Sequence, residues 1–227
     1  MKKLLTVIAV FAISIHYAKA DFILKEDIES AGQVEPMTLY LKEMKCRLDV
    51  SARTSAIIDS ATGDMIVLIP QQKIYLRISA EQLKAQADAM KNIAAGQGSK
   101  NDIQLTPTGN RQTISGHDTE EYQATINGVK SKIFIAKDFP DYLPLVTALY
   151  NLQNGPGLEA FRMMPIPPEK YPGMPMRTEV DVMGQKITTT VTSVEQVPIA
   201  DSEFSVPSDF KELSASKLLN GAHPKTQ

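Results

Sequence analysis

Residues 121–136, EYQATINGVKSKIFIA, decide the fold class of this chain. Two predicted strands, 121–126 and 129–136, flank the pair Asn127-Gly128. Asn-Gly supplies the two residues with positive φ that a tight two-residue turn requires. The segment therefore predicts an antiparallel β-hairpin.

Further strands are predicted on both sides of this hairpin. From Pro36 to Val50 the chain reads as extended, and its second half alternates charged residues with the apolar residues Met44, Cys46, Leu48 and Val50. The remaining predicted strands span 55–59, 64–69, 73–78, 178–182 and 186–194, and another block begins near Ile103. Short connections between successive strands require antiparallel pairing, since a parallel pair needs a long crossover.

A first helix is predicted over 79–95. Ser79 and Gln82 have the spacing of a capping box, and Gly96 ends the helix. One face of this helix carries the apolar residues Leu83, Ala87, Met90 and Ala94.

A second helix is predicted to start at a cap provided by Asp138, with Pro140 in its first turn, and to end near Gln153. Its broad apolar face consists of Tyr142, Leu145, Val146, Leu149, Tyr150 and Leu152. The whole pattern predicts an α+β fold, in which a mostly antiparallel sheet packs on two amphipathic helices.

The first twenty residues predict export. A basic start is followed by a short apolar run, and Ala18-Lys19-Ala20 suits cleavage before Asp21. The run is too short for a membrane-spanning helix, although an uncleaved anchor is the alternative. Because no Cys stands at the cleavage point, we expect a soluble periplasmic protein without a lipid anchor. The expected organisation is a signal peptide over 1–20, one domain over 21–213 and a flexible tail over 214–227.

Composition excludes several function classes. Without the signal peptide, 21 basic and 26 acidic residues give a net charge of −5, and no dense basic cluster exists to bind nucleic acid or an anionic membrane. Cys46 is the lone cysteine, so we expect no disulfide and a buried thiol. The mature chain retains only His117 and His223, so no zinc site and no cofactor is predicted.

Catalytic motifs are absent from the sequence. It has neither a Gly-x-Ser-x-Gly elbow nor a phosphate-binding loop ending in Lys-Ser/Thr. The cluster His117-Asp118-Thr119-Glu120-Glu121 could supply a base oriented by an acid, but the preceding Gly116 favours a polar turn leading into a strand. We therefore predict that the protein is not an enzyme; the remaining alternative is a hydrolase without a recognisable motif.

Methionine and proline are concentrated in residues 163–176. One interpretation is a lid over an apolar cavity, because Met fits irregular apolar ligands; the other is a loop that packs Met onto the sheet edge. Binding of Cu(I) is disfavoured, since no His or Cys accompanies the thioethers.

Several loose patterns resemble a known family. They are Gly63-Asp64-Met65, Gly116 to Tyr122, Tyr171-Pro172-Gly173-Met174-Pro175 and, most specifically, Phe204-Ser205-Val206-Pro207. Over residues 30–213 the chain resembles a family of secreted bacterial proteins labelled as a domain of unknown function, related to the lipoprotein carrier LolA and to LppX and LprG. The resemblance implies a curled antiparallel half-barrel, closed on its concave side by helices, with acyl chains held between the two.

Two hypotheses for the function follow. The first is a periplasmic binding protein that shelters a lipid or acyl ligand, lined by Tyr142, Leu145, Val146, Leu149, Met163 and Met164. The second is a cell-envelope module that binds a protein partner through its sheet edge or Met-rich loop and has a filled core. A continuous apolar cavity under the helices would favour the first, and a solid core would favour the second.

Overall fold

The computed structural model describes residues 21–93, 103–126, 129–158, 166–182 and 184–213. The predicted signal peptide, the tail after residue 213, the turn at 127–128, Met163 and Met164 lie outside these residues.

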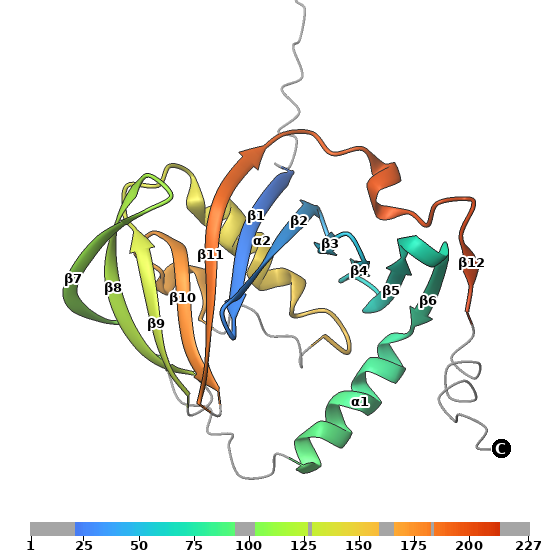
Figure 1. Ribbon diagram of the computed structural model, residues 1–227, viewed down its shortest axis with the longest axis horizontal. Helices are drawn as coiled ribbons and strands as arrows, with labels where there is room; N and C mark the ends of the chain where they lie inside the picture. Colours follow the sequence, from blue (N-terminus) through green and yellow to red (C-terminus); the bar gives the residue numbers. More distant parts are fainter. Residues whose placement is uncertain (1–20, 94–102, 127–128, 159–165, 183, 214–227) are drawn as a thin grey trace, which may run out of the picture.

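The described strands form one curled sheet in the order β12-β6-β5-β4-β3-β2-β1-β11-β10-β9-β8-β7 (Figure 1). Every pair is antiparallel except β12 with β6. The bounds are β1 Phe22–Ser30, β2 Gln33–Lys42, β3 Lys45–Val50, β4 Thr54–Asp59, β5 Asp64–Ile69, β6 Ile74–Ile78, β7 Thr106–Ile114, β8 His117–Ile126, β9 Val129–Ala136, β10 Met174–Val182, β11 Gln185–Gln196 and β12 Lys211–Glu212. The predicted α+β class with a mostly antiparallel half-barrel is confirmed.

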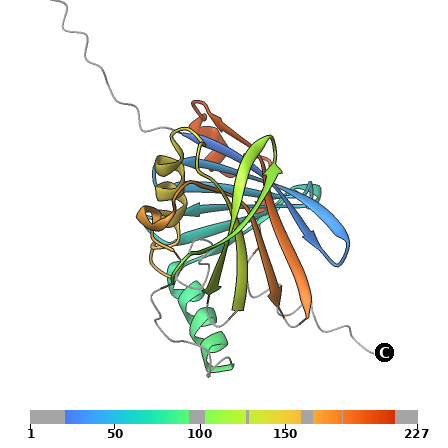
Figure 2. The same cartoon turned by 90° about the vertical axis from the view of Figure 1, so that its left-hand side faces the viewer.

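Strand β1 joins the two halves of the sheet, because it pairs with β2 on one side and with β11 on the other. A β-bulge interrupts the β1–β11 pairing between Lys25 and Glu26, and another interrupts the β9–β10 pairing between Pro175 and Arg177. Bulges bend a sheet and increase its twist. The strong curl is visible in Figure 2. It brings the β7–β8 turn against β11, where the Ser115 hydroxyl donates a hydrogen bond of 2.6 Å to the Val191 carbonyl.

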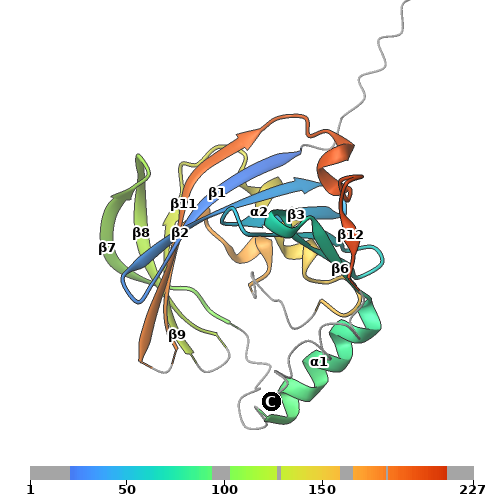
Figure 3. The same ribbon diagram turned by 45° about the vertical axis from the view of Figure 1, so that its right-hand side comes forward.

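The concave face of the sheet holds the main core. Helix α2, Tyr142–Leu152, lies across this face (Figures 1 and 3). It buries Leu145, Val146, Leu149 and Leu152 against residues of β1, β2, β9 and β10.

Helix α1, Ala80–Ile93, packs through Leu83 against Met65 and Leu158. The predicted capping box is present: the Gln82 side chain accepts from the Ser79 amide at 2.9 Å, and the Gln82 amide donates to the Ser79 hydroxyl at 3.3 Å. No helix among the described residues is both long and apolar enough to cross a membrane.

Two local predictions were wrong, and one strand was missed. Asp138 does not cap α2; residues 137–141 turn first, and Asp141, in a left-handed conformation, occupies the N-cap. The extended segment 36–50 is interrupted by a turn, so Met44 is 42% exposed instead of lying within a strand. Strand β1 was not predicted at all.

The opposite face of the sheet carries a smaller core, which is covered by residues 197–213, here called the C-terminal strap. Phe204 and Ile199 of the strap pack on Ile57 and Leu68 of the sheet. The strap then adds β12 beside β6, where the Leu213 amide donates to the Tyr75 carbonyl at 2.8 Å. The Phe-x-Val-Pro pattern therefore has a structural role, because its aromatic residue anchors the strap.

Candidate functional site

An apolar cavity lies between the concave face of the sheet and α2. Its volume is about 300 Å³, at the lower end of the range for small-molecule sites. Residues from six strands and α2 line it: Leu24, Glu26 and Ile28 of β1, Met37 and Leu39 of β2, Ile126 of β8, Ile133 of β9, Met174, Pro175, Met176, Arg177 and Thr178 of β10, Thr189 and Val191 of β11, Leu149 of α2, and Tyr171.

The alternation of side chains along β1 and β2 builds one wall of this cavity. Leu24 and Glu26 are two residues apart and therefore share a face. In the antiparallel register they stand opposite Leu39 and Met37 of β2, which places all four side chains on the concave side. This wall was not predicted from the sequence, although the spacing of Phe22, Leu24, Glu26 and Ile28 fits a strand with one polar position.

Leu149 and Tyr171 come from outside the sheet. The Tyr142 hydroxyl donates a hydrogen bond of 2.9 Å to the Tyr171 carbonyl, which ties the segment before β10 to α2. The backbone at Gly173 packs closely against the end of β9, because a Cβ at this position would overlap the Ala136 carbonyl oxygen. Burial raises the pKa of the Tyr171 phenol above its usual range, so this hydroxyl is neutral near pH 7.

The predicted lining residues have different positions in the structure. Leu149 lines the cavity. Leu145 and Val146 are fully buried in the concave core, and Tyr142 packs beside that core with its hydroxyl on Tyr171. The structure thus brings one of these four to the cavity, while Met163 and Met164 lie outside the described residues. Ligand contact by this set stays a prediction.

Glu26 is the carboxylic acid of this cavity wall. Burial raises its pKa to about 7, because removing a carboxylate from water disfavours its charged form. Among the described residues, none forms a hydrogen bond or ion pair with the Glu26 side chain. Near neutral pH this group is therefore divided between its protonated and ionised forms.

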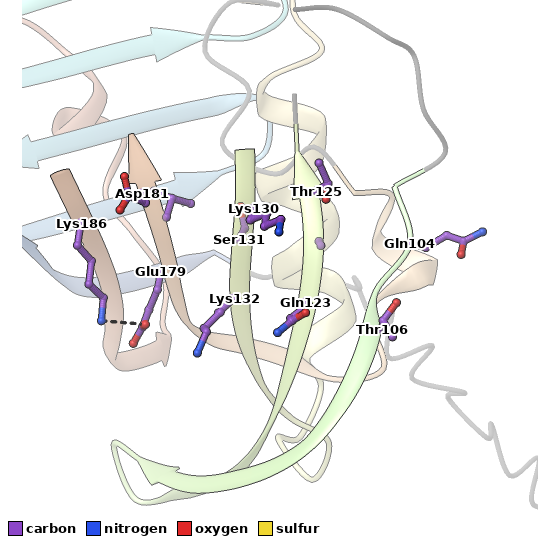
Figure 4. Close-up of a pocket in the computed structure, with 12 residues that line it drawn as sticks. Gln104, Thr106, Gln123, Thr125, Lys130, Ser131, Lys132, Glu179, Asp181 and Lys186 are labelled. Carbon is purple, nitrogen blue, oxygen red and sulfur yellow. Dashed lines mark ion pairs between the residues drawn. The ribbon is translucent and has the colours of Figure 1, made fainter. Parts of the chain in front are cut away.

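A larger, polar cleft of about 660 Å³ lies on the other face of the sheet (Figure 4). Thr106, Gln123, Lys132 and Glu179 form one cross-strand row in it. Ile133 follows Lys132 and Thr178 precedes Glu179, and both of these neighbours line the apolar cavity instead. Because successive side chains of a strand point to opposite faces, this row faces away from the apolar cavity. In the cleft Glu179 forms an ion pair with Lys186 at 2.9 Å, and its mixed charges select no particular ligand class.

The cluster at 117–121 does not converge on one point. The His117 ring contacts Phe139 with ring centroids 4.9 Å apart, whereas the carboxylates of Glu120 and Glu121 pair with Lys137 and Lys132. The Lys137 ammonium holds the pKa of Glu120 below its usual range. These separate pairings favour the interpretation of a polar structural segment, which lies within β8 and not in a turn.

Metal and thiol chemistry find little support in the described part of the chain. No three His, Cys, Asp or Glu side chains there are grouped so as to hold a metal ion. Cys46 is buried, as predicted, and burial, with a smaller effect from Asp49, raises its pKa to about 12. A thiol with this pKa stays protonated and is a poor nucleophile.

Comparison with solved structures gives distant similarities. PNGF-II has 12% identity and a TM-score of 0.39, over 88% of this chain and 32% of that one. The MucA/MucB complex of Pseudomonas aeruginosa has 10% identity and a TM-score of 0.46, over 86% and 58%. The lipoprotein LppX of Mycobacterium tuberculosis has 11% identity and a TM-score of 0.41, over 78% and 88%. This chain therefore spans about a third of PNGF-II and 58% of the matched chain in the MucA/MucB structure.

No curated protein matches the sequence. A family model described as a domain of unknown function, DUF4412, matches residues 24–210, which begin in β1 and end within the C-terminal strap. The match agrees with the resemblance noted in the sequence. The chain belongs to the DUF4412 family.

Proposed function

We propose that this protein is an exported, cell-envelope binding protein that shelters a lipid or acyl chain between its curled sheet and α2. The observation that supports the proposal is the apolar cavity of about 300 Å³. Its wall consists mainly of aliphatic and thioether side chains, and α2 and Tyr171 contribute to its lining from outside the sheet. The apolar start over residues 1–20 supports export.

Affinity would come from removing apolar ligand surface from water. Each buried methylene group contributes about 0.8 kcal/mol, against the loss of ligand freedom on binding. Met174 and Met176 add unbranched, polarizable side chains to the wall, which suit ligands of irregular shape. Binding by this route needs no reacting group, in keeping with a role other than catalysis.

The alternative function, an envelope module that docks a protein partner, requires a filled interior. The cavity next to Leu149 argues for the carrier. If no apolar ligand binds, the interaction hypothesis takes its place.

The first test is mass spectrometry under non-denaturing conditions on residues 21–227, purified from the periplasm of a bacterial host. We expect an added mass that organic solvent removes and that fragments as a lipid. A bare polypeptide mass that persists after incubation with candidate lipids would contradict the proposal.

Two matched variants locate the binding site. Ile28→Trp places a large ring in the cavity, whose wall Ile28 joins while only partly buried. Val34→Trp adds the same ring on β2, where Val34 is 58% exposed. We expect Ile28→Trp to lose most binding of a fluorescent acyl probe and Val34→Trp to retain it. Equal binding by both variants would place the ligand elsewhere.

A further inference from the structure

The apolar cavity contains an acid whose presence the proposed function does not explain. Glu26 lies between Leu24 and Ile28 on β1 and stands opposite Met37 of β2 and Val191 of β11. All four neighbours are apolar. An unpaired polar group in such surroundings is unfavourable, and a Leu or Met at this position would simply extend the wall.

The β-bulge directs this side chain to the cavity. In the β1–β11 register, Lys25 stands opposite Ser193 and Glu26 opposite Val191, so Thr192 is the extra residue. Bulges re-aim side chains and are common beside functional sites. Here the bulge sets Glu26 beside Val191, which also lines the cavity.

The other titratable groups that line the cavity do not neutralise Glu26. Arg177 is engaged elsewhere, because its Nε donates to the Thr190 hydroxyl at 3.0 Å. Thr190 stands opposite Asp27, whose side chain points to the face of β1 opposite that of Glu26. Tyr171 contributes a neutral phenol. The lining residues of β2, β9, β11 and α2 carry no ionisable group. Among the described residues, therefore, no cation pairs with Glu26, although Arg177 lines the same cavity.

We propose that Glu26 determines the ligand specificity of the cavity by selecting apolar molecules that end in a cationic amine over those that end in a carboxylate. A ligand ammonium would pair with the Glu26 carboxylate and relieve its desolvation, whereas a ligand carboxylate would be repelled. The pairing is strong because the surrounding side chains are apolar. This inference rests on the proposed function and names the chemistry of the ligand's polar end.

The test compares three ligands of equal chain length: dodecylamine, dodecanol and dodecanoate, each below its micellar concentration. Their affinities are measured by displacement of an uncharged fluorescent probe at pH 8. For the wild-type protein we expect the amine to bind about tenfold or more tightly than the carboxylate, a difference of at least ~1.4 kcal/mol. The alcohol should lie between them.

Two variants and a control assign the preference to Glu26. Glu26→Gln and Glu26→Leu should bind amine and carboxylate within about threefold of each other while retaining the alcohol, a residual of less than ~0.7 kcal/mol. Glu29→Gln removes an exposed carboxylate from the same strand and should keep the wild-type preference. Moving from pH 6 to pH 8 should strengthen amine binding in the wild type, because Glu26 ionises, and leave it unchanged in Glu26→Gln.

The failures of the two proposals are distinguishable. If the alcohol binds but the wild type shows no preference, prefers dodecanoate, or keeps its preference in Glu26→Gln, the role of Glu26 is overturned while the carrier function stands. If none of the three ligands binds the wild type, both proposals are overturned.

Discussion

Lys42 on β2 and Asp201 in the C-terminal strap form an ion pair with an N–O distance of 2.8 Å. The same ammonium donates to the Ile199 carbonyl, and Arg47 on β3 pairs with Glu203, two residues after Asp201 in the strap. Two neighbouring strands thus align the strap. Its anchoring, however, comes from Phe204, because that ring is buried whereas the Asp201 side chain is 87% exposed.

Phe204→Ala should lower the free energy of unfolding by about 3 kcal/mol, since it removes a buried ring and leaves a cavity. Asp201→Asn should change it little, because an ion pair with one well-exposed partner contributes little to stability. Urea unfolding of both variants measures the difference. A loss as large for Asp201→Asn as for Phe204→Ala would show that the ion pair, and not the ring, holds the strap.

Glu26 should make stability depend on pH. Its pKa in the folded state is about 7, against an ordinary value of 4.5. Below pH 4.5 the group is protonated in both states; between pH 4.5 and 7 only the unfolded state loses the proton, so stability falls by roughly 3 kcal/mol in total. Relative to wild type, Glu26→Gln should therefore gain stability as the pH rises from 4.5 to 8. A pH-independent difference between the two proteins would contradict the raised pKa that partial burial gives Glu26.

Cys46 should resist alkylation in the folded protein. With a pKa of about 12, its thiolate fraction at pH 8 is on the order of a thousandfold smaller than that of an ordinary thiol. Iodoacetamide should modify the native protein far more slowly than the protein in urea, as followed by mass spectrometry. Similar rates in the two states would show that β3 opens readily.

Gly173→Ala should loosen the part of the cavity lining next to Gly173. Its new Cβ would overlap the Ala136 carbonyl oxygen, and the backbone that carries Tyr171 would have to move. We expect a loss of about 1–3 kcal/mol in stability and weaker binding of an acyl probe, with a larger effect for Gly173→Val. Unchanged binding in a folded Gly173→Val variant would mean that Tyr171 does not contribute to ligand affinity.

Local signals in the sequence predicted local structure well. The strand expected over 129–136 is β9, with the same bounds, and the segment expected over 64–69 is β5. Strand β1 was missed because Glu26 interrupts the apolar alternation of Phe22, Leu24 and Ile28, and because its partner β11 lies some 170 residues away. The start of α2 was misplaced because the sequence offers two aspartates that could cap it. Asp138, followed by Pro140, fits a helix N-terminus as well as Asp141, which is the N-cap in the structure.

From the sequence, the cavity could be predicted only as one of two alternatives, the other being a filled core. Apolar periodicity shows which face of a helix or strand is buried, but it does not show whether the facing side chains meet. Leu145 and Leu149 have the same character in the sequence, yet Leu145 is packed in the core and Leu149 borders a void. The difference depends on the curl of the sheet, which arises from bulges at Lys25/Glu26 and Pro175/Arg177.

The position of β1 between β2 and β11 has a consequence for biogenesis. A nascent chain emerges N-terminus first, so β2–β6 can form a meander with β1 early, whereas β11 is made last of the long strands. Until then one side of β1 offers free backbone donors and acceptors to any passing strand. Sheets closed by such distant partners fold slowly. The half-finished molecule is thus the aggregation-prone species, and holding chaperones would act most usefully during that interval.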